Sequence, residues 1–142
     1  MFELDPPMLF SAATGYALQT LAALPEDGNY HLSRDLARKL HLPAPYLAKI
    51  LQSLVQAGLL ESVRGPKGGF RLARPAREVT VGDVLQALEG PEALRGCVMG
   101  PGRCSPGSPC PLHDAWSRVR SLVDSSMAQA TLQDLRQVGG RR

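Results

Sequence analysis

The chain has 142 residues and a mass of 15.3 kDa, the size of one ordinary domain or of a small domain with an appendage, which excludes a multidomain enzyme. Its 44% hydrophobic and 20% charged residues are typical of a globular protein rather than a disordered one. The formal net charge of +3 hides a strong asymmetry, because residues 31–77 carry nine Lys or Arg against two acidic residues. Such a basic segment favours a polyanionic partner, most often nucleic acid, although chance clustering on a solvated surface would look the same.

The cysteine content and the hydropathy pattern indicate where the protein works. Three cysteines are an odd number, which argues against a disulfide framework. No stretch approaches the roughly 18 apolar residues of a membrane span, and residues 1–5 lack the basic start and the apolar run of a signal peptide. We therefore expect a cytoplasmic protein without a membrane partner, whose reduced thiols bind metal or sense redox state.

Two helices are predicted first. Ser11 can cap a helix that ends at the turn-forming residues 25–29. A short extended piece, residues 30–32, follows this turn. Ser33 is then expected to cap a brief second helix over residues 34–40.

The third predicted helix is the most regular. Pro45 suits its first turn, and Gly58 is the expected C-terminal cap. Its apolar residues repeat at helical spacing without a break, and they are Leu47, Ile50, Leu51, Leu54 and Val55. The polar residues of this helix therefore face away from the core, where a partner can read them.

A β-hairpin is expected next, with strands over residues 60–64 and 69–72. Two short helices, a tight turn and a basic hairpin make a winged helix-turn-helix, whose second helix enters the major groove of DNA. We therefore assign residues 1–79 to a winged-helix domain that binds a double-stranded DNA operator; the alternative is a winged helix used only as a protein-interaction scaffold. The candidate DNA-binding residues lie at helix starts, on the polar face of the third helix and in the hairpin turn, and they are Ser33, Ala44, Tyr46, Lys49, Gln52, Ser53, Arg64, Gly65 and Lys67.

Two further helices are expected in the second half of the chain. Thr80 can cap a short amphipathic helix over residues 81–89. The long helix that begins at Leu112 carries an apolar stripe that must be buried. Packing against its copy in a symmetric homodimer is expected, packing against the first helix of the same chain is the alternative, and the two can coexist. The expected fold class is thus mainly α with a small β-hairpin, a winged helix-turn-helix plus a long dimerisation helix. The tail, residues 139–142, is expected to be disordered.

All three cysteines fall in a segment rich in Gly and Pro between these helices. Cys97, Cys104, Cys110 and the nearby His113 offer three thiolates and an imidazole, which can complete a four-ligand metal site. Zinc sites usually bring ligands in close Cys-x2-Cys pairs, whereas iron-sulfur clusters accept wider spacing. A structural zinc and cluster-free thiol sensing at the same cysteines stay as alternatives. No oxyanion-type glycine motif or cofactor fingerprint accompanies Cys110 and His113, so an enzyme is not expected.

Several motifs between about residue 10 and residue 135 are those of one family. They are Tyr16-Ala17-Leu18, Pro45-Tyr46-Leu47, Ser62-Val63-Arg64-Gly65-Pro66-x-Gly68-Gly69-Phe70, Leu88-Glu89-Gly90 and Thr131-Leu132-x-Asp134-Leu135. On these motifs the chain resembles the Rrf2 family of bacterial transcriptional regulators and, with its cysteine segment, the iron-sulfur branch of that family. The resemblance implies a homodimeric regulator, most often a repressor, whose operator binding depends on an iron-sulfur cluster, with 2Fe-2S favoured over 4Fe-4S. It assigns residues 80–142 to the cluster-binding loop and the dimerisation helix.

The fourth ligand distinguishes two types within that branch. In one type a histidine follows the third cysteine after two residues and precedes a tryptophan, as His113 and Trp116 do here. In the other type the ligand is an aspartate before the Tyr-Ala-Leu motif, where this chain has Gly15. The resemblance therefore implies that His113 is the fourth ligand. Ala48 replaces an acidic residue that is common in the recognition helix of the family, so the resemblance does not define the operator sequence.

Overall fold

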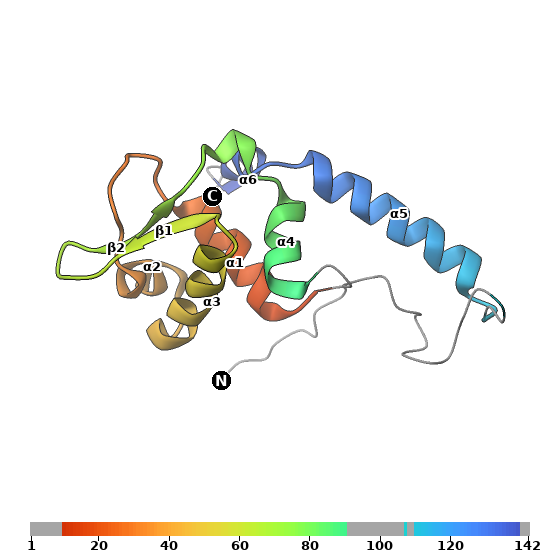
Figure 1. Ribbon diagram of the computed structural model, residues 1–142, viewed down its shortest axis with the longest axis horizontal. Helices are drawn as coiled ribbons and strands as arrows, with labels where there is room; N and C mark the ends of the chain where they lie inside the picture. The colour runs from red at the N-terminus through yellow and green to blue at the C-terminus, as the bar shows by residue number, and fades with distance from the viewer. Residues whose placement is uncertain (1–9, 91–106, 108–109, 140–142) are drawn as a thin grey trace.

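The computed structural model describes residues 10–90, 107 and 110–139, and in these ranges it is mainly helical with one antiparallel hairpin (Figure 1). The elements in chain order are α1 (Ala12–Ala23), α2 (Ser33–Leu40), α3 (Ala44–Gln56), β1 (Leu60–Val63), β2 (Gly69–Leu72), the 3-10 helix η1 (Ala76–Glu78), α4 (Val81–Glu89), α5 (His113–Gln129) and α6 (Leu132–Gly139). The predicted fold class, a winged helix-turn-helix with a long additional helix, is confirmed. The predicted capping role of Ser33 is wrong, because Leu32 holds the cap position and Ser33 is already helical.

The wing is the β1–β2 hairpin, with Leu60 opposite Leu72 and Val63 opposite Gly69. The predicted extended piece completes it, since the backbone N–H groups of His31 and Phe70 each donate to the other residue's carbonyl, at 2.9 and 2.8 Å. Gly69 adopts φ +131°, and a Cβ there would lie 2.2 Å from the carbonyl oxygen of His31. Glycine is therefore required where the wing meets the connection between α1 and α2.

One hydrophobic core joins the helices. The predicted apolar stripe of α3 is buried except for Val55, which is partly buried. Ala17 and Leu21 of α1 pack with it, and so do Val84 of α4 and Leu132 of α6. The core thus crosses the predicted boundary between residues 79 and 80, and the two predicted parts of the chain share it.

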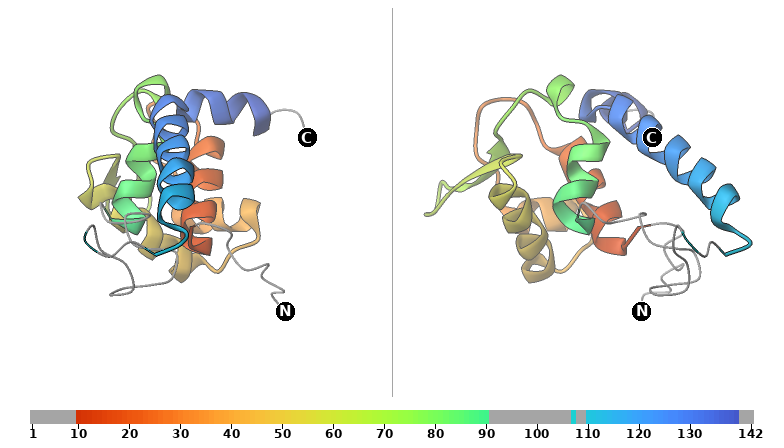
Figure 2. Two further views of the ribbon diagram at one scale, coloured as in Figure 1. Left: turned by 90° about the vertical axis from the view of Figure 1, so that its right-hand side faces the viewer. Right: turned by 45° about the vertical axis from the view of Figure 1, so that its right-hand side comes forward.

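Helix α5 projects from the body, and none of its residues is buried (Figure 2). Its C-terminal end is attached by two backbone hydrogen bonds: Val81 N–H donates to the Ala130 carbonyl at 2.8 Å, and Leu132 N–H donates to the Val79 carbonyl at 2.9 Å. The sequence did not predict α6, which returns onto α1 and includes the first residue of the tail that was expected to be disordered. Residues 140–142 of that tail lie outside the described ranges.

Candidate nucleic-acid interface and cysteine segment

Helix α3 separates a buried face from an exposed polar face. Lys49 and Gln52 are exposed, and Tyr46 exposes 39% of its surface at the start of the helix. Ser53 is partly buried, and its hydroxyl donates to the Lys49 carbonyl at 3.3 Å, so its hydrogen is already engaged. Five of the predicted DNA-binding residues, these four and Ala44, therefore lie on one helix, and the exposed Tyr46, Lys49 and Gln52 are the most available to a ligand.

The start of α3 is fixed by a tight turn and by a contact with α1. His41 adopts the left-handed φ of 57°, which reverses the chain between α2 and α3. Ala44 is the first residue of α3 and is partly buried. The Tyr46 ring meets the Tyr16 ring of α1 edge-on, with centroids 6.0 Å apart and planes at 84°. Helix α1 thus supports the end of α3 that carries Tyr46.

The tip of the wing presents cations to solvent. Arg64, Gly65 and Lys67 are all exposed, and neither cation forms an ion pair with another residue that the structure describes. Gly65 has φ +113°, and its carbonyl accepts the N–H of Gly68 at 3.0 Å, which closes the turn. The turn therefore holds two unpaired cations at its surface.

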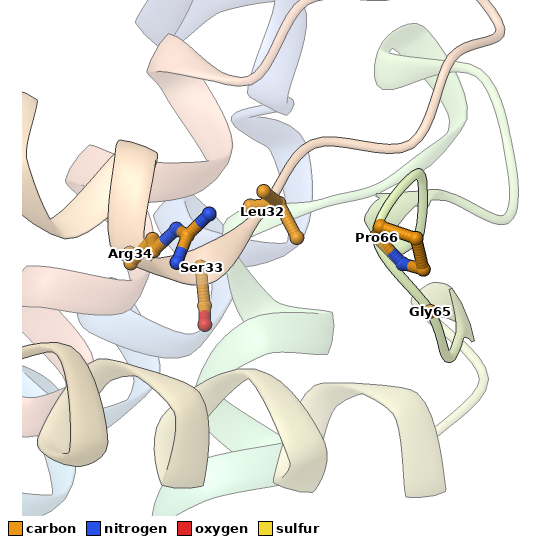
Figure 3. Close-up of a pocket in the computed structure, with 5 residues that line it drawn as sticks. All are labelled: Leu32, Ser33, Arg34, Gly65 and Pro66. Atoms are coloured by element: carbon orange, nitrogen blue, oxygen red, sulfur yellow. The ribbon is translucent and has the colours of Figure 1, made fainter.

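An open groove of about 280 Å³ separates the wing from the start of α2. Leu32, Ser33 and Arg34 line one side, and Gly65 and Pro66 line the other (Figure 3). The fold thus brings together Ser33 and Gly65, which the sequence predicted separately. It also adds Arg34, which sequence reasoning missed as a site residue although it lies in the basic segment.

The basic segment divides into paired and available cations. Arg71 bonds Glu61 at 2.9 Å, lies 4.4 Å from the centre of the Tyr30 ring and donates to the Gly28 carbonyl. The hydrogen bond to Glu61 raises the pKa of Arg71. Because three groups of the chain hold it, this cation has a structural role. Arg74 lies 3.5 Å from Asp83. The other cations of the segment are exposed, and they are Arg34, Arg38, Lys39, Lys49, Arg64, Lys67 and Arg77.

Two of the four predicted metal ligands are described, and they lie within one turn of each other. His113 is the first residue of α5, and its N–H donates to the Cys110 carbonyl at 3.0 Å. Both residues are partly buried. Cys97 and Cys104 lie outside the described ranges, and no group of three or more potential ligands is found within them. A thiolate and an imidazole at the start of one helix fit iron or zinc by donor chemistry.

A carboxylate that the sequence singled out only as part of the Leu88-Glu89-Gly90 motif, without a role of its own, lies at the end of α4. Glu89 Oε1 accepts the backbone N–H of Ser11 and the hydroxyl of Thr14, both at 2.7 Å. Burial raises the pKa of Glu89, but these hydrogen bonds outweigh burial, so its pKa lies below the ordinary glutamate value. These partners are more than 70 positions apart in the sequence, and no local pattern could have revealed them.

A comparison with known families agrees with this architecture. Residues 10–137 match the profile of the Rrf2 family, described as iron-dependent transcriptional regulators. The chain belongs to the Rrf2 family. Within the described ranges, no helix of this Rrf2 protein is long and apolar enough to cross a membrane.

Relatives and solved structures place it among transcriptional regulators. A candidate HTH-type transcriptional regulator of Aquifex aeolicus is 31% identical over 131 residues, which are 90% of this chain and 91% of the relative. The structure of CymR, the global cysteine regulator of B. subtilis, has a TM-score of 0.74 and 26% identity and covers 97% of this chain and 98% of its own. The T. potens IscR structure has a TM-score of 0.70 and 26% identity, with coverage of 96% and 89%. This Rrf2 protein is therefore a transcriptional regulator with the winged-helix fold.

Proposed function

We propose that this Rrf2 regulator binds a double-stranded DNA operator as a homodimer and that an iron-sulfur cluster in residues 80–142 modulates its operator affinity. The observation that carries the DNA-binding part is the position of unpaired cations on two elements of one winged helix. Lys49 lies on the exposed face of α3, while Arg64 and Lys67 lie at the tip of the wing. A helix fits the major groove, and a narrow minor groove attracts cations such as those of the wing.

The groove between the wing and α2 supports the same proposal. Ser33 and Arg34 line it, and hydroxyl and guanidinium groups bind phosphate oxygens in protein–DNA complexes. Phosphate contacts of this kind fix the register of a protein on the duplex, while base contacts from α3 select the sequence. Lys49 and Gln52 have the donors for base edges, and Tyr46 can donate through its hydroxyl.

Alanine variants test the DNA-binding part with a duplex that the wild-type protein selects from a random-sequence pool. If Lys49 contacts a base, the Lys49→Ala variant should lose about 1–3 kcal/mol of binding free energy, and its sequence preference should relax at one base pair. Arg64→Ala should weaken binding on all sequences and lower the slope of log affinity against log salt by about 1. Arg77→Ala is the matched control, because Arg77 is an exposed cation on η1. Equal affinities for all three variants and the wild type would contradict the proposed interface.

The cluster part rests on donor chemistry. Cys97, Cys104, Cys110 and His113 would hold the cluster, and the turn from Cys110 to His113 already brings one thiol and one imidazole to the start of α5. When bound, an iron-sulfur cluster supplies a redox-active centre whose charge and lability respond to oxidation state and to small ligands. Residues 80–142 also include the projecting helix α5, so a change at its start can alter how two copies of the chain are oriented.

Anaerobic reconstitution with iron and sulfide, read by absorption and by metal and sulfide assay, tests this part. The Cys97, Cys104 and Cys110 variants to alanine should take up no cluster. His113→Ala should give a labile cluster or none, whereas His113→Cys should keep a cluster of lower reduction potential, because thiolate is more negative than imidazole. If the cluster in His113→Ala had the reduction potential and lifetime of the wild-type cluster, the fourth ligand would be a residue other than His113. Uptake of zinc and no iron by the wild type would favour the structural-zinc scaffold.

A cluster-free regulator is the second candidate. The structural likeness to CymR, the global cysteine regulator of B. subtilis, supports sensing by thiol chemistry at the cysteines of this chain. In that case the wild type would take up no cluster, and mild oxidation of the metal-free protein would change its operator affinity. Replacement of the cysteines by serine would abolish the response to oxidation.

A further inference from the structure

Glu89 completes the N-terminal cap of α1 from another helix. In a capping box, a side chain at the third helical position accepts the N–H of the cap residue. The third helical position of α1 is Thr14, but the N–H of the cap residue Ser11 donates to Glu89 instead, and the Thr14 hydroxyl also donates to Glu89. Glu89 accepts both the N–H of the cap residue Ser11 and the Thr14 hydroxyl, so it takes the acceptor role from outside the helix. Its negative charge also lies at the positive end of the α1 dipole.

Glu89 occupies a particular position in the chain. It is the last residue of α4 and precedes Gly90, after which the sequence enters the segment with Cys97 and Cys104. Thr14, its partner on α1, is 1% exposed, so the bond from its hydroxyl to Glu89 is protected from water. The start of α1 is thus fixed to the end of α4 at the entrance to the cysteine segment.

The same turn of α1 supports the recognition helix. Tyr16 follows Thr14 by two residues, and its ring makes the edge-on contact with Tyr46 of α3. An α-helix transmits a displacement of its first turn with little loss, because its backbone hydrogen bonds hold neighbouring residues in fixed geometry. A shift of Glu89 would therefore move Thr14 and Tyr16 together and change the position of Tyr46.

We propose that Glu89 is a positioning residue for the recognition helix, acting through Thr14 and Tyr16 on Tyr46. Because Glu89 precedes the cysteine segment in the sequence, we take it as the point at which that segment regulates DNA binding; this second statement rests on the function proposed above. The described residues provide each step: two hydrogen bonds of 2.7 Å and one aromatic contact connect α4, α1 and α3.

Two threonines of α1 provide a matched pair of variants for the test. Thr14 is 1% exposed and donates to Glu89, while Thr20 is 0% exposed and donates to the Tyr16 carbonyl of its own helix at 2.7 Å. Each Thr→Val change removes one buried hydroxyl at nearly constant shape. In the metal-free protein, Thr14→Val should weaken binding to the selected duplex by roughly 2- to 30-fold, the range for residues that modulate coupling between sites. Thr20→Val should bind like the wild type at a temperature where circular dichroism shows both variants folded.

Substitutions at Tyr16 examine the next step. Tyr16→Phe keeps the ring and should keep the affinity, whereas Tyr16→Leu should reproduce the loss seen for Thr14→Val. The double variant Thr14→Val/Tyr16→Leu should lose little more than either single variant, because both changes interrupt the same connection. Equal affinities for Thr14→Val and Thr20→Val, or losses that multiply in the double variant, would overturn the positioning role.

Cluster loading tests the regulatory statement. For each protein we compare the affinity for the selected duplex with the cluster reconstituted and without metal. The ratio of these two affinities should differ from one in the wild type and should approach one in Thr14→Val and in Glu89→Ala. Glu89→Gln, which retains an acceptor oxygen, should recover part of the ratio. A ratio unchanged by these variants would overturn the regulatory role. A wild type that takes up no cluster would instead refute the proposed cluster function and this regulation with it, while the threonine comparison in metal-free protein would still decide the positioning role.

Discussion

Where the turn of the wing leads into β2, single residues decide whether the hairpin can form. The backbone at Gly69 combines a φ of +131° with a carbonyl oxygen, that of His31, only 2.2 Å from where a Cβ would be. Gly68 is constrained by space alone, since its Cβ would lie 2.1 Å from the Val63 carbonyl oxygen. Backbone atoms cannot move aside as a flexible side chain can, so the strain cannot be relieved locally.

We expect Gly69→Ala to lower the free energy of unfolding by about 2 kcal/mol or more, because it combines backbone strain with a clash against main-chain atoms. Gly15→Ala is the control within α1. Gly15 has no atom within 4 Å of a built Cβ and no positive φ, so alanine there should stabilise the helix by up to about 1 kcal/mol. Urea unfolding measures the change in the free energy of unfolding for both variants. If both variants were stabilised, or both destabilised, the proposed strain at Gly69 or the proposed freedom at Gly15 would be contradicted.

At the scale of whole elements, two capping boxes face each other where α4, α5 and α6 meet. Thr80 and Asp83 exchange hydrogen bonds of 3.0 Å at the start of α4. Thr131 and Asp134 repeat the arrangement at the start of α6, with bonds of 2.9 and 3.2 Å. Thr80 and Thr131 are themselves paired in an antiparallel bridge. The junction therefore fixes where α5 leaves the body.

Loss of one cap should loosen this junction. Thr131→Ala should cost about 1 kcal/mol of stability, because the Asp134 N–H loses its acceptor. Thr131→Ser keeps the hydroxyl and should cost only a small part of that. Amide hydrogen exchange should locate the effect in α6 and in the part of α1 that it covers. Faster exchange spread evenly over the whole chain would indicate that the box does not act locally.

At the scale of the molecule, the exposed apolar face of α5 bears on how two copies of the chain assemble into a dimer. Leu122 is 68% exposed, Leu112 46% and Val119 44%, although they belong to the stripe that the sequence predicted to be buried. The alternative burial against α1 of the same chain is not what the structure shows, because no residue of α5 is buried. Apolar surface of this kind favours the other predicted solution, burial against the same helix of a second copy.

We expect the protein to be a dimer at micromolar concentration, with or without metal. Leu122→Glu should shift it toward the monomer in sedimentation experiments, because a charge would be placed among the apolar side chains of the interface. Ser121→Glu is the control, since Ser121 lies on the opposite face of α5 and is also exposed. A dimer that persists in Leu122→Glu, or a wild type that pairs only after cluster loading, would contradict this interface.

Much of the fold could be predicted because it depends on near neighbours in the sequence. The apolar stripe of α3, the Thr80 cap of α4 and Gly65 in the turn of the wing act over a few residues, and the structure contains each of them. The prediction for Ser33 was wrong by one position because Leu32, next to the bridge between His31 and Phe70, is extended and takes the cap position. Helix α6 was missed because its apolar face is short and its partner, α1, lies at the other end of the chain.

The sequence by itself determined the type of each long element, the family motifs and the residues with the chemistry for DNA and metal. Only the tertiary structure decided which of these residues are exposed to a partner and which are engaged by other residues of the chain. Arg71 belongs to the basic segment, yet it is engaged by Glu61 and Tyr30, whereas Arg34 lines the groove beside the wing. The bond between Thr14 and Glu89 joins residues 75 positions apart. Helical spacing, caps and turns depend on contacts within a few residues and can be read from the chain, but ion pairs and caps between distant elements exist only once burial of the common core has brought those elements together.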